Sequence, residues 1–335
     1  GYTGSNQVYV AVIDSGIDVS HPDLAANIWV NPEETPGNGI DDDGNGFIDD
    51  VHGFDFVNRD GSVFDESENF HGTHVAGTIA AVGGNGIGVA GVSWNTKLIS
   101  AKMINADGGA SYSDAIAAID YVTMLRTQKG LDIIASNNSW GGSGYSKFME
   151  EAIQRGGDAG IIFVAAAGND RNDNDGDGHN PVETYPASYD CSTGDRPWDC
   201  VVSAGAHDQA GELAFFSSYG TTTVDLLAPG MDVTSTLPND TYGSLSGTSM
   251  AAPHVTGAIA LCLGANRGMS ALGAIESLKN TVTVDATLSG TVATSGRLNV
   301  LTLATDCASQ QADFADAPSF HIANATYTNR IRLDW

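Results

Sequence analysis

The stretch that decides the fold places a serine at the start of an apolar segment. It reads Gly247-Thr248-Ser249-Met250-Ala251-Ala252-Pro253-His254 and continues into Val255-Thr256-Gly257-Ala258-Ile259-Ala260-Leu261. The pattern predicts a buried helix beginning near Ser249, since Pro253 is tolerated in a first turn, where a missing N–H costs little. Such a serine is either an ordinary N-terminal cap or a nucleophile whose oxyanion faces the helix-end N–H groups.

Two further stretches supply an acid and a base for a nucleophile. The run Gln7–Ile13 is apolar and β-branched and ends at Asp14-Ser15-Gly16. It predicts a buried parallel strand, and a carboxylate just past its carboxyl end lies in the crevice where open α/β sheets bind ligands. Alone, Asp before Gly is equally typical of a turn. The stretch His71-Gly72-Thr73-His74-Val75-Ala76-Gly77 opens a helical pattern, which predicts a rigidly held base beside the cleft.

In chain order these residues form an acid, a base and a hydroxyl nucleophile: Asp14, His71 and Ser249. The combination favours the nucleophile interpretation of Ser249. An alternative for His71 and His74 is a zinc site, because residues at i and i+3 share a helix face. No Glu follows the first His as in the His-Glu-x-x-His zinc motif, so we assign His71 as the base.

These motifs resemble those of the subtilisin-like serine proteases, over Gly1 to about Ala304. The order Asp, His, Ser is the order found in subtilisin. In outline the chain is nearest to the marine bacterial deseasin-like members. The resemblance implies a serine endopeptidase, a structural role for His74, and an oxyanion donor at Asn169, which follows the apolar run Ile161–Ala167. By pattern alone, Gly-Asn after a strand is only a turn.

Apolar runs and helical patterns alternate along the chain, which predicts a doubly wound, mostly parallel α/β sheet. The resemblance implies the subtilisin-like three-layer sandwich. We expect strands over 8–13, 97–103, 131–137, 161–166 and 201–206, and helices over 71–82, 113–129, 147–159, 249–263 and 269–280.

We expect a catalytic domain over 1–304 and a linker or C-terminal tail over 305–335. In the tail, 308–311 has the composition of a linker, and 319–322 and 327–335 alternate like exposed strands. The tail is either packed on the core or the beginning of a truncated β-domain.

Composition is that of an extracellular hydrolase. The net charge of −27, from 14 basic and 41 acidic residues, argues against nucleic acid as a partner. No run approaches the roughly 20 apolar residues of a membrane span, and no signal peptide is visible before Gly1. Together with the resemblance, these bounds lead us to expect a secreted, monomeric enzyme acting on proteins or peptides. The resemblance adds an N-terminal propeptide in the precursor, and we expect no organic cofactor.

The run Asp41–Asp50 predicts a calcium site. From Asp41 it reads D-x-D-x-N-G, the opening of an EF-hand-type loop, with oxygen ligands on alternate residues and Gly at the bend. His52 occupies the twelfth position, where that loop has Glu, so Asp49 or Asp50 has to close the shell. The expected ligands are Asp41, Asp43, Asn45, Phe47, Asp49 and Asp50.

Two more loops are candidates for calcium, so we expect more than one ion. The run from Asp173 opens as D-x-D-x-D-G and is either a site formed by Asp173, Asp175 and Asp177 or a flexible acidic loop. The resemblance implies a further site after the helix of the catalytic histidine, formed by Asp23, Val82, Asn85, Ile87 and Val89.

Four cysteines favour oxidising surroundings. Cys191 and Cys200 flank a polar loop, in a segment where simpler subtilases are shorter, so we expect a local disulfide. Cys262 and Cys307 remain, and form either a second disulfide or two buried thiols.

Substrate contacts follow from the resemblance. The pocket that holds the substrate residue before the cleaved bond would have walls formed by Ser139-Trp140-Gly141 and Ala166-Ala167-Gly168. The substrate backbone would pair, as an added β-strand, with Gly108-Gly109-Ala110. Tyr112 would cap a pocket three residues further out. Apolar walls favour apolar side chains. At the floor, Thr184 beside Glu183 either narrows the pocket or admits a basic side chain.

Two other classes of protein remain open. An esterase or amidase can use the same triad, and a comparison of casein with a short ester distinguishes it. A calcium-dependent binding protein on an inactive protease scaffold would not react with a fluorophosphonate.

Overall fold

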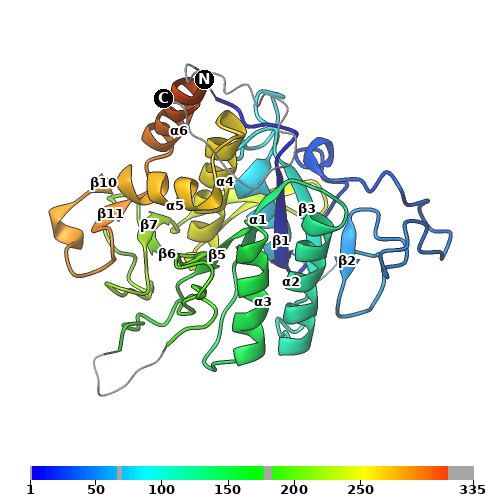
Figure 1. The fold of residues 1–335 in the computed structure, drawn as a ribbon, viewed down its shortest axis with the longest axis horizontal. Coiled ribbons are helices and arrows are strands. Elements are labelled where there is room, and N and C mark those ends of the chain that lie inside the picture. The colour runs from blue at the N-terminus through cyan, green and yellow to red at the C-terminus, as the bar shows by residue number, and fades with distance from the viewer. Residues whose placement is uncertain (1, 66–69, 177–182, 316–335) are drawn as a thin grey trace, which may run out of the picture.

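The structure, a computed structural model, describes residues 2–65, 70–176 and 183–315 (Figure 1). Its helices and strands run in the order β1 Tyr9–Asp14, η1 Ala25–Asn27, β2 Gly53–Asp55, α1 Phe70–Ala80, β3 Lys97–Lys102, α2 Tyr112–Thr127, β4 Ile133–Asn138, α3 Lys147–Asp158, β5 Ile162–Ala166, β6 Val201–His207, β7 Leu226–Pro229, β8 Val233–Leu237, β9 Thr241–Leu245, α4 Thr248–Ala265, α5 Ala271–Asn280, β10 Thr283–Val284, η2 Ala286–Leu288, β11 Gly296–Arg297 and α6 Val300–Ala315.

One sheet forms the middle layer, in the order β10-β11-β7-β6-β5-β4-β1-β3-β2. Its pairs are parallel except for β10 with β11, and β1 lies between β3 and β4 in register Val10↔Leu98 and Val10↔Ala135. β8 and β9 form a separate antiparallel hairpin that packs on α1. The expected doubly wound, mostly parallel sheet is confirmed.

Side chains of β1 alternate between two hydrophobic cores. Val10 and Val12 face one core with residues of α1, α4, α5 and α6, and Ala11 and Ile13 face the other with residues of α2 and α3. Because successive residues of a strand point to opposite faces, this alternation places helices on both sides of the sheet. Figure 1 shows α2 and α3 side by side. The expected three-layer sandwich is confirmed.

α4 is the central helix. Its 18 residues make it the one described helix long and apolar enough to cross a membrane, but 78% of it is buried inside the protein, where it packs on strands of the sheet. A buried core helix has the same composition.

The C-terminal segment differs from our expectation. The boundary placed between Ala304 and Thr305 falls within α6, and 308–311, predicted as a linker, is helical. α6 packs on α4 and α5, because Leu303, Ala304 and Cys307 are buried. The strands expected at 319–322 and 327–335 lie outside the described residues.

Candidate active site

Four predicted catalytic residues lie at one edge of the sheet. Asp14 is the last residue of β1, Asn169 lies three residues after β5, and His71 and Ser249 are the second residues of α1 and α4. Carboxyl ends of parallel strands and the starts of the helices packed on them meet at one edge, where open α/β sheets bind ligands.

Asp14 and His71 form a buried acid–imidazole pair. Asp14 is fully buried, and its Oδ1 accepts hydrogen bonds from the Ser15 N–H (2.7 Å) and from His71 Nδ1 (2.8 Å). Burial lowers the pKa of His71, but the charge of Asp14 and its hydrogen bond outweigh burial, so the pKa lies above its ordinary value of 6.5. The side chain of His71 stays 27% exposed, and Asp14 is bonded to its Nδ1 rather than its Nε2.

Glycine allows α1 to begin so close to β1. The Gly72 N–H donates to Ser15 Oγ (3.0 Å), and a Cβ at Gly72 would lie 2.2 Å from the carbonyl oxygen of Gly16. Real Cβ atoms do not approach backbone oxygen so closely, so only glycine fits. This contact holds His71 against Asp14.

Ser249 and Asn169 are close together at the start of α4. The Ser249 hydroxyl donates to the Ser139 carbonyl oxygen (3.2 Å), and Asn169 Oδ1 accepts from Thr248 N (2.8 Å) and Thr248 Oγ1 (3.0 Å). These bonds turn the Asn169 Nδ2 group away from Thr248. A Cβ at Gly247 would lie 3.6 Å from both Asn169 Nδ2 and Ser249 N and 3.7 Å from Asn169 Oδ1, so the Asn169 amide and the Ser249 N–H lie near one another.

His74 contacts the β8–β9 hairpin. It is fully buried, and its Nε2 lies 2.9 Å from the Val233 carbonyl oxygen and 3.2 Å from that of Gly243. Burial lowers its pKa to about 4, so the ring is neutral and donates from Nε2. His74 therefore fastens α1 to the hairpin.

Two hollows share the wall Trp140-Gly141-Gly142, and the first of them reaches Ser249. The first, of about 440 Å³, is also lined by Ser143, Ala166, Gly168, Asn169, Asp170, Glu183, Thr184, Thr248 and Ser249. The second, of about 240 Å³, is also lined by Ile104, Gly108, Ala110, Ser111, Tyr112, Ala115, Met149 and Tyr185. Asp170, which the sequence analysis overlooked, adds a carboxylate to the first hollow.

The segment Gly108–Ala110 is exposed, follows a turn and belongs to none of the described strands. The Asn105 N–H donates to the Gly109 carbonyl oxygen (2.9 Å), and the Gly108 N–H donates to the Asn105 carbonyl oxygen (3.0 Å). The Gly109 N–H donates to Asn105 Oδ1 (2.9 Å), so the polar backbone groups of this segment that bond to no other described residue are the Gly108 carbonyl and both groups of Ala110.

Thr184 closes the first hollow from below. It is 9% exposed, its hydroxyl donates to Asn174 Oδ1 (3.3 Å), and its methyl carbon would lie 3.2 Å from a Cβ at either Gly141 or Gly168. The side chain therefore lies between the two glycine walls and takes up space in the hollow.

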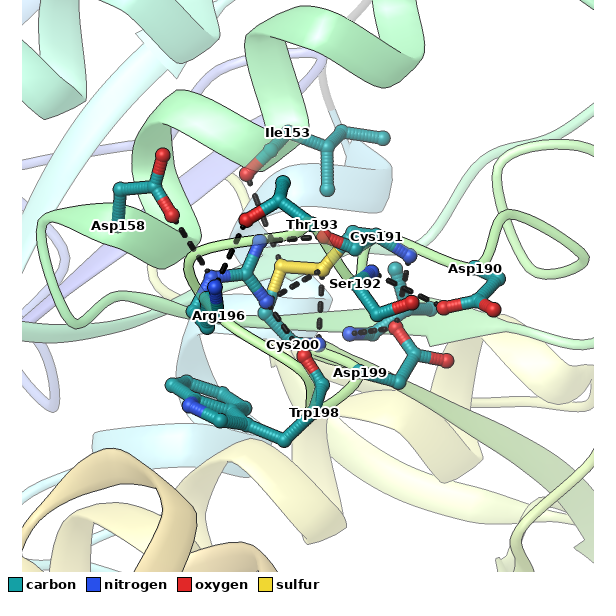
Figure 2. Close-up of a disulfide and its surroundings, with 11 residues drawn as sticks. Ile153, Asp158, Asp190, Cys191, Ser192, Thr193, Arg196, Trp198, Asp199 and Cys200 are labelled. Carbon is teal, nitrogen blue, oxygen red and sulfur yellow. Dashed lines mark hydrogen bonds and ion pairs between the residues drawn. A yellow bond between two sulfur atoms is a disulfide. The ribbon is translucent and has the colours of Figure 1, made fainter.

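After Thr184, the chain continues into a loop that is closed by the Cys191–Cys200 disulfide (Figure 2). Buried Arg196 crosses the loop: its Nε donates to Asp158 Oδ1 (2.9 Å), its NH1 to the Trp198 carbonyl oxygen (2.6 Å) and its NH2 to that of Cys191. The guanidinium also lies 4.8 Å from the Trp198 ring centre. The expected local disulfide is present, and of the two alternatives for Cys262 and Cys307 the structure has the disulfide.

The acidic loop Asp41–Asp50 is arranged differently from an EF-hand loop. Carboxylate oxygens of Asp41 and Asp43 lie close to one from Glu34, seven residues before the motif. Asn45 contacts Asp43, whereas Asp49 accepts hydrogen bonds from the backbone of a neighbouring turn. Phe47 places its ring among the buried aromatic residues Phe54, Phe56 and Tyr121, and Asp50 is fully buried.

The loop after α1 lies against Asp23, and its contacts with Asp23 are made by N–H groups. Asp23 Oδ1 accepts from Asn85 Nδ2 (2.5 Å), its Oδ2 accepts from the Val89 N–H (2.9 Å), and its carbonyl oxygen accepts from the Val82 N–H (2.8 Å). Ile87 lies in the same loop, with its N–H donating to Asn85 Oδ1 (3.1 Å).

In the acidic run that begins at Asp173, the described carboxylates already accept hydrogen bonds from groups of the protein. Asp175 accepts hydrogen bonds from Thr221, Thr222 and Thr223, which together outweigh burial and lower its pKa. Asp173 Oδ1 accepts from the Asp175 N–H (3.1 Å), and Asp177 lies outside the described residues. The arrangement favours a structural role for Asp175, whose hydrogen bonds connect its loop to the loop of Thr221–Thr223.

Comparisons with known proteins identify the family. The family model "Subtilase family" matches residues 5–310. Subtilisin DY of Bacillus licheniformis is 38% identical over 283 residues, covering 84% of this chain and 86% of the relative. Subtilisin J of Geobacillus stearothermophilus is also 38% identical, over 78% of this chain but 57% of that longer relative.

Among solved structures, a cold adapted subtilisin-like serine proteinase superposes with a TM-score of 0.66 at 27% identity, covering 89% of each chain. The matches span the sheet, both helix layers and the edge that holds Asp14, His71 and Ser249. The chain belongs to the subtilase family, whose members are serine endopeptidases.

Proposed function

We propose that this enzyme is secreted and hydrolyses peptide bonds of proteins through Asp14, His71 and Ser249, with broad specificity and a preference for apolar side chains. The observation that carries the proposal is the Asp14–His71 hydrogen bond of 2.8 Å, at the same sheet edge as Ser249 and Asn169. A buried carboxylate on Nδ1 fixes the imidazole tautomer that leaves Nε2 as the base.

In the first half of the reaction, Ser249 Oγ attacks the substrate carbonyl carbon and its proton moves to His71 Nε2. The negative oxygen that forms accepts hydrogen bonds from Asn169 Nδ2 and the Ser249 N–H. The C–N bond then breaks, and His71 returns the proton to the departing amine, leaving Ser249 acylated. In the second half a water replaces the amine, and the acid is released.

The shape of the cleft supports the apolar preference. Trp140 and Ala166 line the first hollow, and Thr184 takes up space in it, which favours side chains of moderate size. Tyr112 and Met149 line the second hollow, which suits an apolar side chain further along the substrate. Asp170 and Glu183 also line the first hollow and are exposed, so a basic side chain is the second candidate.

We also propose that the enzyme binds calcium as a structural ion, that its precursor has an N-terminal propeptide, and that it is a monomer. Two disulfides support an oxidising, extracellular setting. Carboxylate and carbonyl oxygens suit calcium, and the loop around Asp23 and the loop Asp41–Asp50 offer them. Bound there, the ion would stabilise the folded state by mass action.

Incubation with casein and with a fluorophosphonate tests the proposal. We expect casein hydrolysis that the fluorophosphonate stops, and a labelled peptide containing Ser249. Hydrolysis of a short ester without casein cleavage would favour an esterase, and failure to label would favour a binding protein on an inactive scaffold.

The raised pKa of His71 predicts the acid limb of the pH profile. His71 acts as a base only when neutral, so activity is lost as pH falls through its pKa. Because Asp14 raises that pKa above 6.5, kcat/KM should fall below a midpoint higher than 6.5. Initial rates with a peptide substrate from pH 5 to 10 measure it. A midpoint below 6 would contradict the assignment.

Removing the Asn169 amide should lower kcat by about 10²–10³-fold with KM little changed, a magnitude known for the same donor in subtilisin. Asn169→Ala also removes the acceptor of the Thr248 N–H. Asn169→Asp keeps that acceptor and loses the donor, so it should be as inactive as the alanine variant. An Asp variant with near-normal kcat would disprove the oxyanion role.

A further inference from the structure

We propose that Glu34, Asp41 and Asp43 bind one calcium ion, and that Lys129 is an internal cation that competes with it for Asp43. The inference deepens the calcium part of the proposed function and does not depend on the catalytic residues. It differs from the sequence expectation, which left the shell to be closed by Asp49 or Asp50.

The three carboxylates converge from two stretches of chain. One oxygen from each lies within 4.8 Å of the oxygens of the other two. Asp41 Oδ1 also accepts from the Asn45 N–H (3.0 Å) and Asp43 Oδ1 accepts from the same group (2.9 Å), which orients both toward the inside of the turn. Ionised carboxylates this close repel one another unless a cation lies between them.

Glu34 supplies the independent indication of a ligand. It is 7% exposed, and its Oε1 accepts from the backbone N–H groups of Asp42 (2.9 Å) and Asp43 (3.1 Å). Its Oε2 is buried and has no hydrogen-bond partner among the described residues. A buried carboxylate oxygen without a partner is costly, whereas calcium takes such oxygens as ligands.

Asp49 is held elsewhere. Its two oxygens accept from the backbone N–H groups of Asn38 (3.1 Å) and Gly39 (2.9 Å), which belong to the turn before the motif. The carboxylate therefore stabilises that turn and is a matched control: it has the same charge as the proposed ligands, lies in the same loop and does not join their cluster.

Asp50 supports the site from behind. Asn31 Nδ2 donates to Asp43 Oδ2 (3.1 Å) and Asp50 Oδ1 (3.0 Å), and Asn45 Nδ2 donates to Asp43 Oδ2 (3.1 Å) and Asp50 Oδ2 (2.9 Å). Asp50 Oδ2 also accepts from the Tyr121 hydroxyl of α2 (2.8 Å). Both oxygens of Asp50 are thus occupied, and the residue positions Asp43 through two amides.

Lys129 is the cation that lies against the cluster. Its Nζ is 3.2 Å from Asp43 Oδ2 and 3.1 Å from Glu33 Oε2, and it donates to the Asp43 carbonyl oxygen (2.9 Å). One ammonium cannot neutralise three carboxylates. A divalent ion would draw Asp43 away from Lys129, so the lysine weakens ion binding without being part of the site.

Calcium titration of the Ser249→Ala enzyme tests the proposal, because that variant cannot digest itself. Isothermal titration calorimetry gives the affinities. Terbium luminescence excited through tyrosine reports on ions near Tyr121 and near Tyr242, whose hydroxyl lies 3.1 Å from Asp23 Oδ2, so it is read in the Asp23→Asn background. We expect Glu34→Gln to weaken one binding event at least tenfold, while Asp49→Asn stays within twofold of the parent. Asp23→Asn identifies the events that belong to the other loop.

Lys129→Gln provides a second, opposite readout. The lysine side chain is 22% exposed, so the variant should fold, and the same binding event should tighten about two- to fivefold. Unchanged affinity in both Glu34→Gln and Lys129→Gln would overturn the proposal. So would loss in Asp49→Asn equal to that in Glu34→Gln. Neither result would bear on Ser249, since casein hydrolysis by the parent enzyme is measured separately.

Discussion

Replacing Ser249 by alanine should abolish proteolysis while leaving the fold intact. The variant loses the atom that forms the acyl-enzyme, so kcat should fall on the order of 10⁶-fold, a value known for subtilisin rather than derived from this geometry. The structural cost is small, because the Ser249 hydroxyl makes one hydrogen bond of 3.2 Å to the Ser139 carbonyl oxygen. One such bond contributes about 1 kcal/mol.

Ser246→Ala is the matched control. Ser246 lies three residues earlier, is exposed, and contacts Asp232 rather than the residues at the sheet edge. It should keep its activity on casein and its reaction with the fluorophosphonate, and Ser249→Ala should lose both. Residual casein hydrolysis by purified Ser249→Ala above about one thousandth of the parent rate would contradict the role of Ser249.

The sequence could predict the catalytic edge because each residue ends or begins a regular element. Asp14 follows a buried strand, and Ser249 opens an apolar helix, so topology alone brings them to one edge. The pairing of Cys191 with Cys200 was equally accessible, since few residues separate them. The hairpin of β8 and β9 was not predicted, because its side chains are mostly polar and half-exposed.

The proposed calcium ligands were harder to predict, because Glu34 lies outside the EF-hand-like pattern that begins at Asp41. The EF-hand-like spacing identifies Asp41 and Asp43, but the loop turns back on the preceding segment instead of continuing into a helix. Asp175 shows the same limit, since the threonines that hold it lie 46 to 48 residues away in sequence. Such contacts are set by loop packing, for which residue spacing gives no signal.

α6 was misjudged for a related reason. Ala308-Ser309-Gln310-Gln311 is polar and has a linker's composition, but Leu303 and Cys307 give the helix a buried side against α4 and α5. The disulfide from Cys307 to Cys262 then fixes that helix to the core. The Asn266 side chain adds a hydrogen bond to the Cys307 carbonyl oxygen (3.0 Å).

Removing the Cys262–Cys307 disulfide should lower the free energy of unfolding more than removing the Cys191–Cys200 disulfide. The Cys262–Cys307 bond closes a loop of 45 residues and the Cys191–Cys200 bond a loop of 9. Restricting the unfolded chain by those loops contributes about 4 and about 3 kcal/mol, respectively, in the chain-entropy estimate. All four cysteines are fully buried, so the packing lost on replacement by alanine is similar in the two pairs.

The measurement is guanidinium unfolding of the two double variants, Cys262→Ala with Cys307→Ala and Cys191→Ala with Cys200→Ala, each in the Ser249→Ala enzyme to prevent autolysis. The first should unfold at the lower denaturant concentration, and limited proteolysis should cut it first near α6, because that helix is held to the core by few other covalent or polar ties. A larger loss in the Cys191 pair would mean that the packing of Arg196 in its loop, rather than loop length, determines what each disulfide contributes.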